Sequence, residues 1–74
     1  MPIAMNEAWL TNIIEESIKK VGEARITTVL LIQVFNVPFS NIERRLETFC
    51  KWNGLWYKLS IPEGITTFYK GKRK

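Results

Sequence analysis

The sequence predicts an α+β fold in which three helices are followed by a C-terminal β-hairpin. Two patterns lead to this prediction. Apolar residues recur at helical spacing between residues 6 and 21. Between residues 55 and 61 apolar and polar residues alternate, and a Pro-Glu-Gly turn at 62–64 leads into a second strand-like run at 65–69. The length of 74 residues suits one domain, which we take to be 1–74.

The first helix is expected to run from Asn6 to Val21. The Asn6 side chain can accept a hydrogen bond from a free backbone N–H of the first turn. Gly22 suits the left-handed backbone conformation that commonly ends a helix. The side of this helix that should pack on the core is an apolar stripe of Leu10, Ile13, Ile14, Ile18 and Val21.

A largely apolar segment that starts at Thr27 or Thr28 and ends near Phe35 is expected to form a short buried helix. Its pattern is compatible with a strand as well. The threonines in front of it and the Asn-Val-Pro breaker at 36–38 favour the helix. The preceding residues 25–26 are extended in this interpretation and would add a third strand to the hairpin.

The third helix is expected over about residues 40–53, beginning at Phe39 or Ser40. Ser40 would be its N-cap, with Glu43 three residues later completing a capping box. The stripe predicted to be buried contains Ile42, Leu46, Phe49, Cys50 and Asn53. The residues predicted to face away from it are Ser40, Asn41, Arg44, Thr48 and Lys51, with Arg45 on the flank.

Charge is distributed unevenly along the chain, whose net charge is +4. Residues 1–39 carry three Lys or Arg against four Glu, whereas residues 40–74 carry eight Lys or Arg against three Glu. This asymmetry indicates a polyanionic partner for the second half. A solvated basic surface that keeps a small domain soluble is the alternative interpretation.

The residue inventory argues against an enzyme. The chain contains no His and no Asp, so His-based catalytic groups are impossible. Metal-ligand clusters and glycine-rich phosphate loops are absent from the sequence, and we expect no metal, no cofactor and no small-molecule ligand. Cys50 has no second cysteine to pair with. No apolar run approaches the roughly 18 residues of a membrane span, so no membrane partner is expected.

The order helix, short strand, helix, turn, helix, hairpin resembles the winged helix-turn-helix family of DNA-binding proteins. The resemblance extends from residue 26 to residue 69. It rests on Ile-Thr-Thr at 26–28, the turn Asn-Val-Pro-Phe-Ser-Asn at 36–41, Ile-Glu-Arg-Arg-Leu-Glu at 42–47, Trp-Asn-Gly-Leu at 52–55 and the hairpin turn.

This resemblance implies three helices with a two- or three-stranded β-hairpin wing. The helix at about 40–53 would be the recognition helix in the major groove, and the hairpin at 55–69 would be the wing. The size is similar to that of winged-helix regulators from archaea and from their viruses and plasmids. The family often has a leucine four residues before the glycine that closes the recognition helix. Cys50 stands there, and we expect Phe49 to take over its packing role.

The predicted DNA contacts fall into two groups. Asn41 and Arg44 suit base edges, because Asn can bond adenine and Arg can bond guanine with two hydrogen bonds each, while Thr48, Lys51 and Arg45 lie near them on the same helix. The residues expected to contact phosphates at helix starts and along the hairpin are Thr27, Thr28, Ser40, Lys58, Ser60, Thr66 and Lys70. Residues 70–74 are expected to form a mobile basic tail that adds affinity without sequence preference.

The function predicted from these residues is binding of double-stranded DNA by a transcriptional regulator, inside the cell and associated with the nucleoid. A winged-helix adaptor that binds other proteins is the alternative. A homodimer is also expected, with Trp9 as a candidate contact residue. RNA binding ranks lower, because the hairpin offers no evident aromatic platform. Trp52 and Trp56, like Trp9, are interpreted as core or interface residues, and Arg44 and Arg45 could instead form surface ion pairs.

Overall fold

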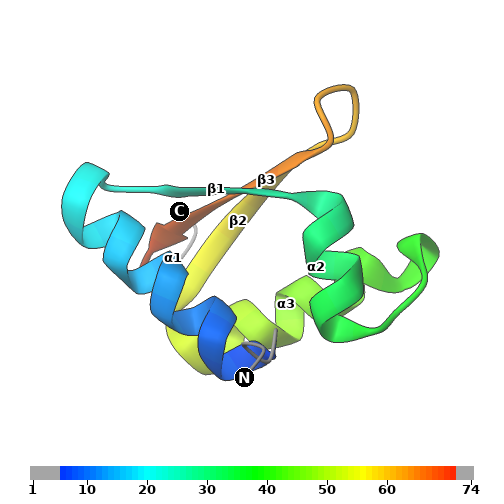
Figure 1. Ribbon diagram of the computed structural model, residues 1–74, viewed down its shortest axis with the longest axis horizontal. Helices are drawn as coiled ribbons and strands as arrows, with labels where there is room; N and C mark the ends of the chain where they lie inside the picture. The colour runs from blue at the N-terminus through cyan, green and yellow to red at the C-terminus, as the bar shows by residue number, and fades with distance from the viewer. Residues whose placement is uncertain (1–5, 72–74) are drawn as a thin grey trace, which may run out of the picture.

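The computed structural model describes residues 6–71 and confirms the α+β class, with three α-helices and a three-stranded antiparallel sheet (Figure 1). The elements in chain order are α1 (Glu7–Val21), β1 (Ala24–Thr27), α2 (Thr28–Phe35), the short 3-10 helix η1 (Phe39–Asn41), α3 (Ile42–Asn53), β2 (Leu55–Ser60) and β3 (Ile65–Lys70).

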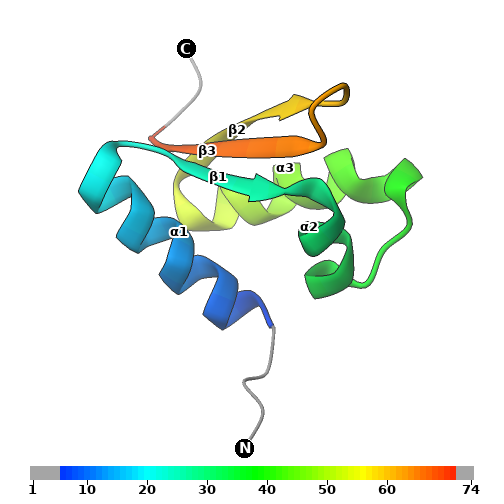
Figure 2. The same ribbon diagram turned by 45° about the horizontal axis from the view of Figure 1, so that its top comes forward.

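The third strand predicted at residues 25–26 is present as β1. The strand order is β1-β3-β2, so β3 lies in the centre and pairs with both neighbours in antiparallel fashion. All three helices lie on one side of the sheet, and no described element covers the other side (Figure 2). Paired residues on neighbouring strands share a face, so the register decides which side chains enter the core.

Helix ends follow the predicted capping residues in most places. The backbone N–H of Trp9 donates to Asn6 Oδ1 at 3.0 Å and starts α1. Gly22 and Gly54 end α1 and α3 with φ of 86° and 64°, and Asn36 ends α2 with φ of 56°. These three residues take the left-handed conformation that stops a helix while its last carbonyls stay hydrogen-bonded.

The start of α3 differs from the prediction. Ser40 lies inside η1, α3 begins at Ile42, and the N-cap residue Asn41 makes no side-chain capping bond. The capping box between Ser40 and Glu43 is therefore not formed. The reason is local, since the backbone N–H of Asn41 donates to the carbonyl of Pro38 at 2.9 Å and closes a tighter turn just before the helix.

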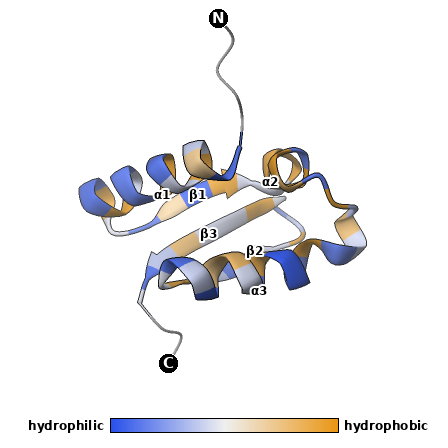
Figure 3. Cartoon of the chain, turned by 90° about the horizontal axis from the view of Figure 1, so that it is seen from below, coloured by the Kyte–Doolittle hydropathy of each residue, from blue (hydrophilic) through white to orange (hydrophobic). Residues whose placement is uncertain are grey.

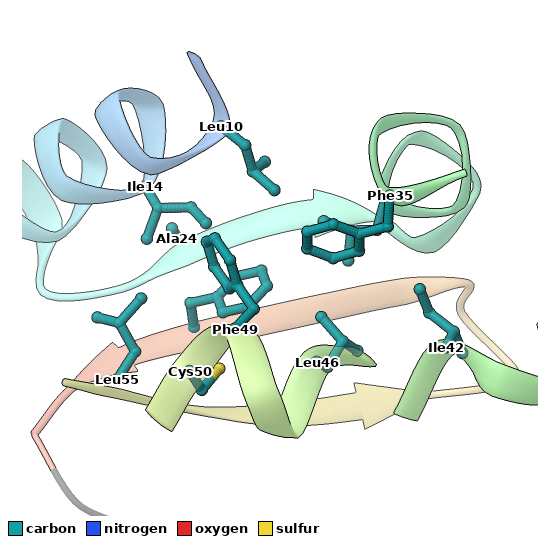
Figure 4. Packing of buried hydrophobic residues seen from close by; sticks show 11 residues of the cluster. Leu10, Ile14, Ala24, Phe35, Ile42, Leu46, Phe49, Cys50 and Leu55 are labelled. Carbon is teal, nitrogen blue, oxygen red and sulfur yellow. The ribbon is translucent and has the colours of Figure 1, made fainter. Parts of the chain in front are cut away.

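The hydrophobic core fills the space between the helices and the sheet (Figure 4). Phe49 lies near its middle, with ring centroids 5.3 Å from Phe35 and 5.9 Å from Phe68. The predicted stripe of α3 is confirmed, including the burial of Cys50 beside Phe49. Val21, predicted in the stripe of α1, is 71% exposed because it is the last residue of that helix. The buried apolar residues are Leu10, Ile14, Ala24, Leu31, Phe35, Ile42, Leu46, Phe49, Cys50, Leu55 and Phe68.

Two threonines predicted to contact DNA are part of this interior instead. Thr66 is 0% and Thr28 is 5% exposed, and their hydroxyl oxygens lie 3.1 Å apart in a hydrogen bond. Thr66 pairs with Ile26 and Leu59 in the sheet, and this register turns its side chain toward the helices. The prediction of DNA contacts for Thr28 and Thr66 is therefore wrong.

Substituting valine for one of these threonines should cost more stability than substituting both. Thr66→Val leaves the Thr28 hydroxyl buried without a partner, at a cost of about 1–3 kcal/mol. In the double variant with Thr28→Val both polar groups are gone, so part of that loss should be recovered. Urea denaturation of the two single variants and the double variant measures the free energy of unfolding of each. A loss in the double variant equal to the sum of the two single losses would contradict the prediction.

Candidate nucleic-acid interface

The solvent-facing side of α3 carries three of the predicted contact residues. Arg44, Thr48 and Lys51 are exposed and lie opposite the stripe that packs on the core. The Thr48 hydroxyl donates to the Arg44 carbonyl at 3.3 Å, so its oxygen can still accept a hydrogen bond. In Figure 3, hydrophilic stretches alternate with apolar ones along α3, as expected for a helix with one buried and one polar side.

The two neighbouring arginines of α3 have different surroundings. Arg45 Nη2 lies 2.6 Å from Glu7 Oε2 of α1, and the guanidinium stands 4.6 Å from the centre of the Phe35 ring. Its side chain is only 28% exposed. The ion-pair alternative therefore holds for Arg45, which helps attach α1 to α3. Within residues 6–71, Arg44 is in no ion pair and projects into solvent.

The entrance of α3 contributes two further polar residues. Ser40 and Asn41 are exposed in η1, directly before the first turn of the helix. The backbone N–H groups of that first turn have no partner inside the helix. Ser40, Asn41, Arg44, Thr48 and Lys51 are all exposed along this side of the helix, and we call them the α3 face; the exposed carboxylate of Glu47 lies among them at helical spacing.

The hairpin residues do not join the α3 face. Lys58 and Ser60 lie on the side of the sheet that no helix covers, whereas α3 packs on the opposite side. The Ser60 hydroxyl donates to Glu63 Oε1 at 2.9 Å. Lys70 is paired with Leu55 and borders a depression beside Glu15 and Lys19 of α1. The predicted site residues are therefore distributed over three different surfaces.

The first residues of the expected basic tail, 70 and 71, are part of the folded structure. Lys70 is the last residue of β3, and the backbone N–H of Gly71 donates to the carbonyl of Gly54 at 2.8 Å. Residues 72–74, which carry the remaining cations of the predicted tail, lie outside the described residues.

Two surface features escaped the sequence interpretation. Trp56 and Tyr69 stack on the uncovered face of the sheet, with ring centroids 4.1 Å apart and an interplanar angle of 19°. The hairpin does therefore present paired aromatic rings, contrary to the expectation that it lacks them. Trp56 was interpreted as a core or interface residue, and its position opposite Tyr69 depends on a strand register that the sequence does not specify. Trp52, interpreted as a core or interface residue, is 83% exposed on α3.

The second feature is an apolar groove of about 180 Å³ between α2, η1 and the tip of the hairpin. Three large exposed side chains, Val29, Phe39 and Ile61, line it. Ile61 was predicted to continue β2, but the strand ends at Ser60 and Ile61 lies in the turn. Trp9 is half-buried and packs against the core.

The part of the chain from residue 6 to residue 71 contains no cluster of three His, Cys, Asp or Glu that could hold a metal ion. None of its helices combines the length and the apolar character needed to cross a bilayer. Comparison of the chain with protein-family models, with curated proteins and with solved structures finds no match.

Proposed function

We propose that this protein is a winged helix-turn-helix protein that binds double-stranded DNA and regulates transcription, with α3 as its recognition helix. The observation that carries the proposal is the α3 face, where Arg44 and Lys51 project from a helix whose other side is fixed in the core. A major groove about 12 Å wide admits one such helix. The turn that joins α2 to α3 leaves the start of α3 exposed, where recognition helices contact base edges.

The residues of the α3 face divide by their position along the helix. Asn41 and Arg44 lie at its start and suit base edges, as bidentate partners of adenine and guanine. Ser40, Thr48 and Lys51 suit phosphate oxygens, which position the helix without reading the sequence. The hairpin contributes as a wing only through the turn between β2 and β3, because Lys58 and Ser60 point away from the α3 face.

Arg44→Ala should weaken binding to the best site selected from a random duplex pool by about 1–3 kcal/mol, the usual value of a bidentate arginine–guanine contact. Circular dichroism and the urea midpoint should not change, because Arg44 makes no ion pair within the described part of the chain. Fluorescence anisotropy with labelled duplex measures the affinity. An unchanged Kd in a folded Arg44→Ala protein would remove this residue from the interface.

Arg45→Ala is the matched control on the neighbouring position. It breaks the contact with Glu7 and the stacking on Phe35, so it should lower the urea midpoint. Its effect on duplex affinity should be small, because the Arg45 side chain is turned toward α1. A reversed pattern, with Arg45→Ala impairing binding more than Arg44→Ala, would move the interface to the α1 side of the helix.

A second candidate function is a winged-helix adaptor that binds another protein. The apolar groove bordered by Val29, Phe39 and Ile61 favours it, because contiguous exposed apolar surface marks interaction sites. The same groove is also a candidate contact for the expected homodimer, which would read paired half-sites on DNA. Light scattering with and without duplex DNA tests this, since a dimer gives the mass of two chains. If the protein binds no duplex even at low salt, the adaptor becomes the better proposal.

A further inference from the structure

The uncovered face of the sheet combines aromatic rings with a cation that is in no ion pair among the described residues. Trp56 on β2 and Tyr69 on β3 are direct partners in the register, and both are partly exposed. Within residues 6–71 β2 is an edge strand, so no described strand lies on the side of the Trp56 indole turned away from Tyr69. Trp56 is partly exposed, so part of the indole is open to a flat ligand at this edge of the sheet.

The next row of the same face lies two residues along the strands, about 7 Å away. In this row the register places Lys58, Thr67 and Arg25 side by side on the three strands. Arg25 is neutralised by Glu23, at 2.8 Å. Lys58 is exposed and is in no ion pair between residues 6 and 71, although the carboxylates of Glu43 and Glu63 border the same depression.

We propose that this face binds single-stranded DNA, with an unpaired base stacked on Trp56 and a neighbouring phosphate at Lys58. The aromatic rings favour a single strand, because the base faces of a duplex are covered by their own neighbours whereas an unpaired base can stack on a side chain. The positive charge one row away complements the backbone of that strand. The choice of DNA over RNA rests on the proposed function, in which the protein already acts on DNA.

This site is separate from the α3 face. α3 packs on the covered side of the sheet (Figure 2), whereas the strand register puts Trp56 and Tyr69 on the uncovered side. A protein bound to duplex through α3 can hold a displaced strand on the other side. A purely structural pair of rings would stabilise the sheet but would give no oligonucleotide affinity that depends on Lys58.

The test measures Kd by anisotropy for a labelled 12-nucleotide oligo-dT and for a labelled duplex of about the same length. Trp56→Leu should raise the oligo-dT Kd about tenfold, the range expected for losing one base–aromatic stack. Trp52→Leu makes the same substitution at an exposed position on α3 and should leave that Kd unchanged. Trp56→Tyr keeps an aromatic face and should retain most of the affinity, which separates stacking from a fold defect.

The charge arm uses Lys58→Glu, an exposed substitution away from the core. It should weaken oligo-dT binding and lower the magnitude of the slope of log affinity against log salt by at least about 0.7, the value of one single-strand phosphate contact. An unchanged slope, or Trp56→Leu behaving like Trp52→Leu, would overturn the proposal. Oligo-rU that binds as tightly as oligo-dT, with the same dependence on Trp56, would overturn the choice of DNA.

Arg44→Ala distinguishes the failure of this site from the failure of the proposed function. Arg44→Ala should raise the Kd for duplex alone, while Trp56→Leu should raise the Kd for oligo-dT alone. If either variant lost affinity for both the duplex and oligo-dT, the two ligands would share one surface, which would contradict two separate sites.

Discussion

Phe49→Ala is expected to remove about 3–5 kcal/mol from the free energy of unfolding. Phe49 is 2% exposed and its ring contacts the rings of Phe35 on α2 and Phe68 on β3. Truncation leaves a cavity at the point where α3, α2 and the sheet meet. Natural domains keep only about 0.05–0.15 kcal/mol per residue, so a chain of 74 residues loses a large share of its stability.

Trp52→Ala on the same helix is the control for this prediction. Trp52 is larger than Phe49 but is 83% exposed, so its truncation should change stability by no more than about 0.5 kcal/mol. Urea denaturation followed by circular dichroism compares the two. Similar losses for both variants would mean that the α3 stripe is not the centre of the core.

The helices and strands could be predicted from the sequence because their signals are local. The Asn6 cap and the stops at Gly22 and Gly54 depend on residues within one turn of each helix end. The start of α3 was missed because two local signals compete there. A capping box at Ser40 and a tight turn after Pro38 involve overlapping residues, and the backbone bond from Asn41 to Pro38 prevails.

The buried threonines and the aromatic pair could not be predicted, because they depend on strand register. Thr66 is separated from Thr28 by 38 residues, and only the pairing of β1 with β3 brings their hydroxyls together. The same pairing rules bring Trp56 opposite Tyr69. A hydroxyl or an aromatic residue in a strand carries no local sign of which side of the sheet it will occupy when the flanking positions are mixed.

Only part of the candidate site could be predicted, because local periodicity is visible in the sequence and packing between distant segments is not. Helical periodicity separates the outward Arg44 from the buried stripe, and the structure agrees with that separation. Periodicity leaves Arg45 on the flank of the helix. Whether its side chain is free to contact DNA there depends on which element packs beside it. The packing of α1 supplies Glu7 as its partner, and this contact between segments far apart in the sequence turns a predicted DNA contact into an internal one.

The Cys50 thiol is expected to react with a disulfide reagent such as DTNB about a thousandfold more slowly in the folded protein than in the unfolded chain. Burial raises the pKa of Cys50 from 9.0 to about 12. The thiolate is the reactive form, and three pH units lower its fraction at pH 8 by about a thousand. Phe49→Ala raises the unfolded fraction exponentially with the free energy it removes, so it should accelerate the reaction once that fraction exceeds about one thousandth, the relative reactivity of the buried thiol.

The raised pKa of Cys50 also decides how the free energy of unfolding changes with pH. The unfolded chain releases the thiol proton near pH 9 and the folded protein near pH 12, so the contribution of the neutral thiol to stability is complete below pH 9 and is lost as pH rises toward 12. Rapid labelling of the native protein at pH 8 would place Cys50 at the surface. Because the rotation of α3 that buries Cys50 also exposes Arg44, Thr48 and Lys51, that result would remove the α3 face and with it the main support for duplex binding.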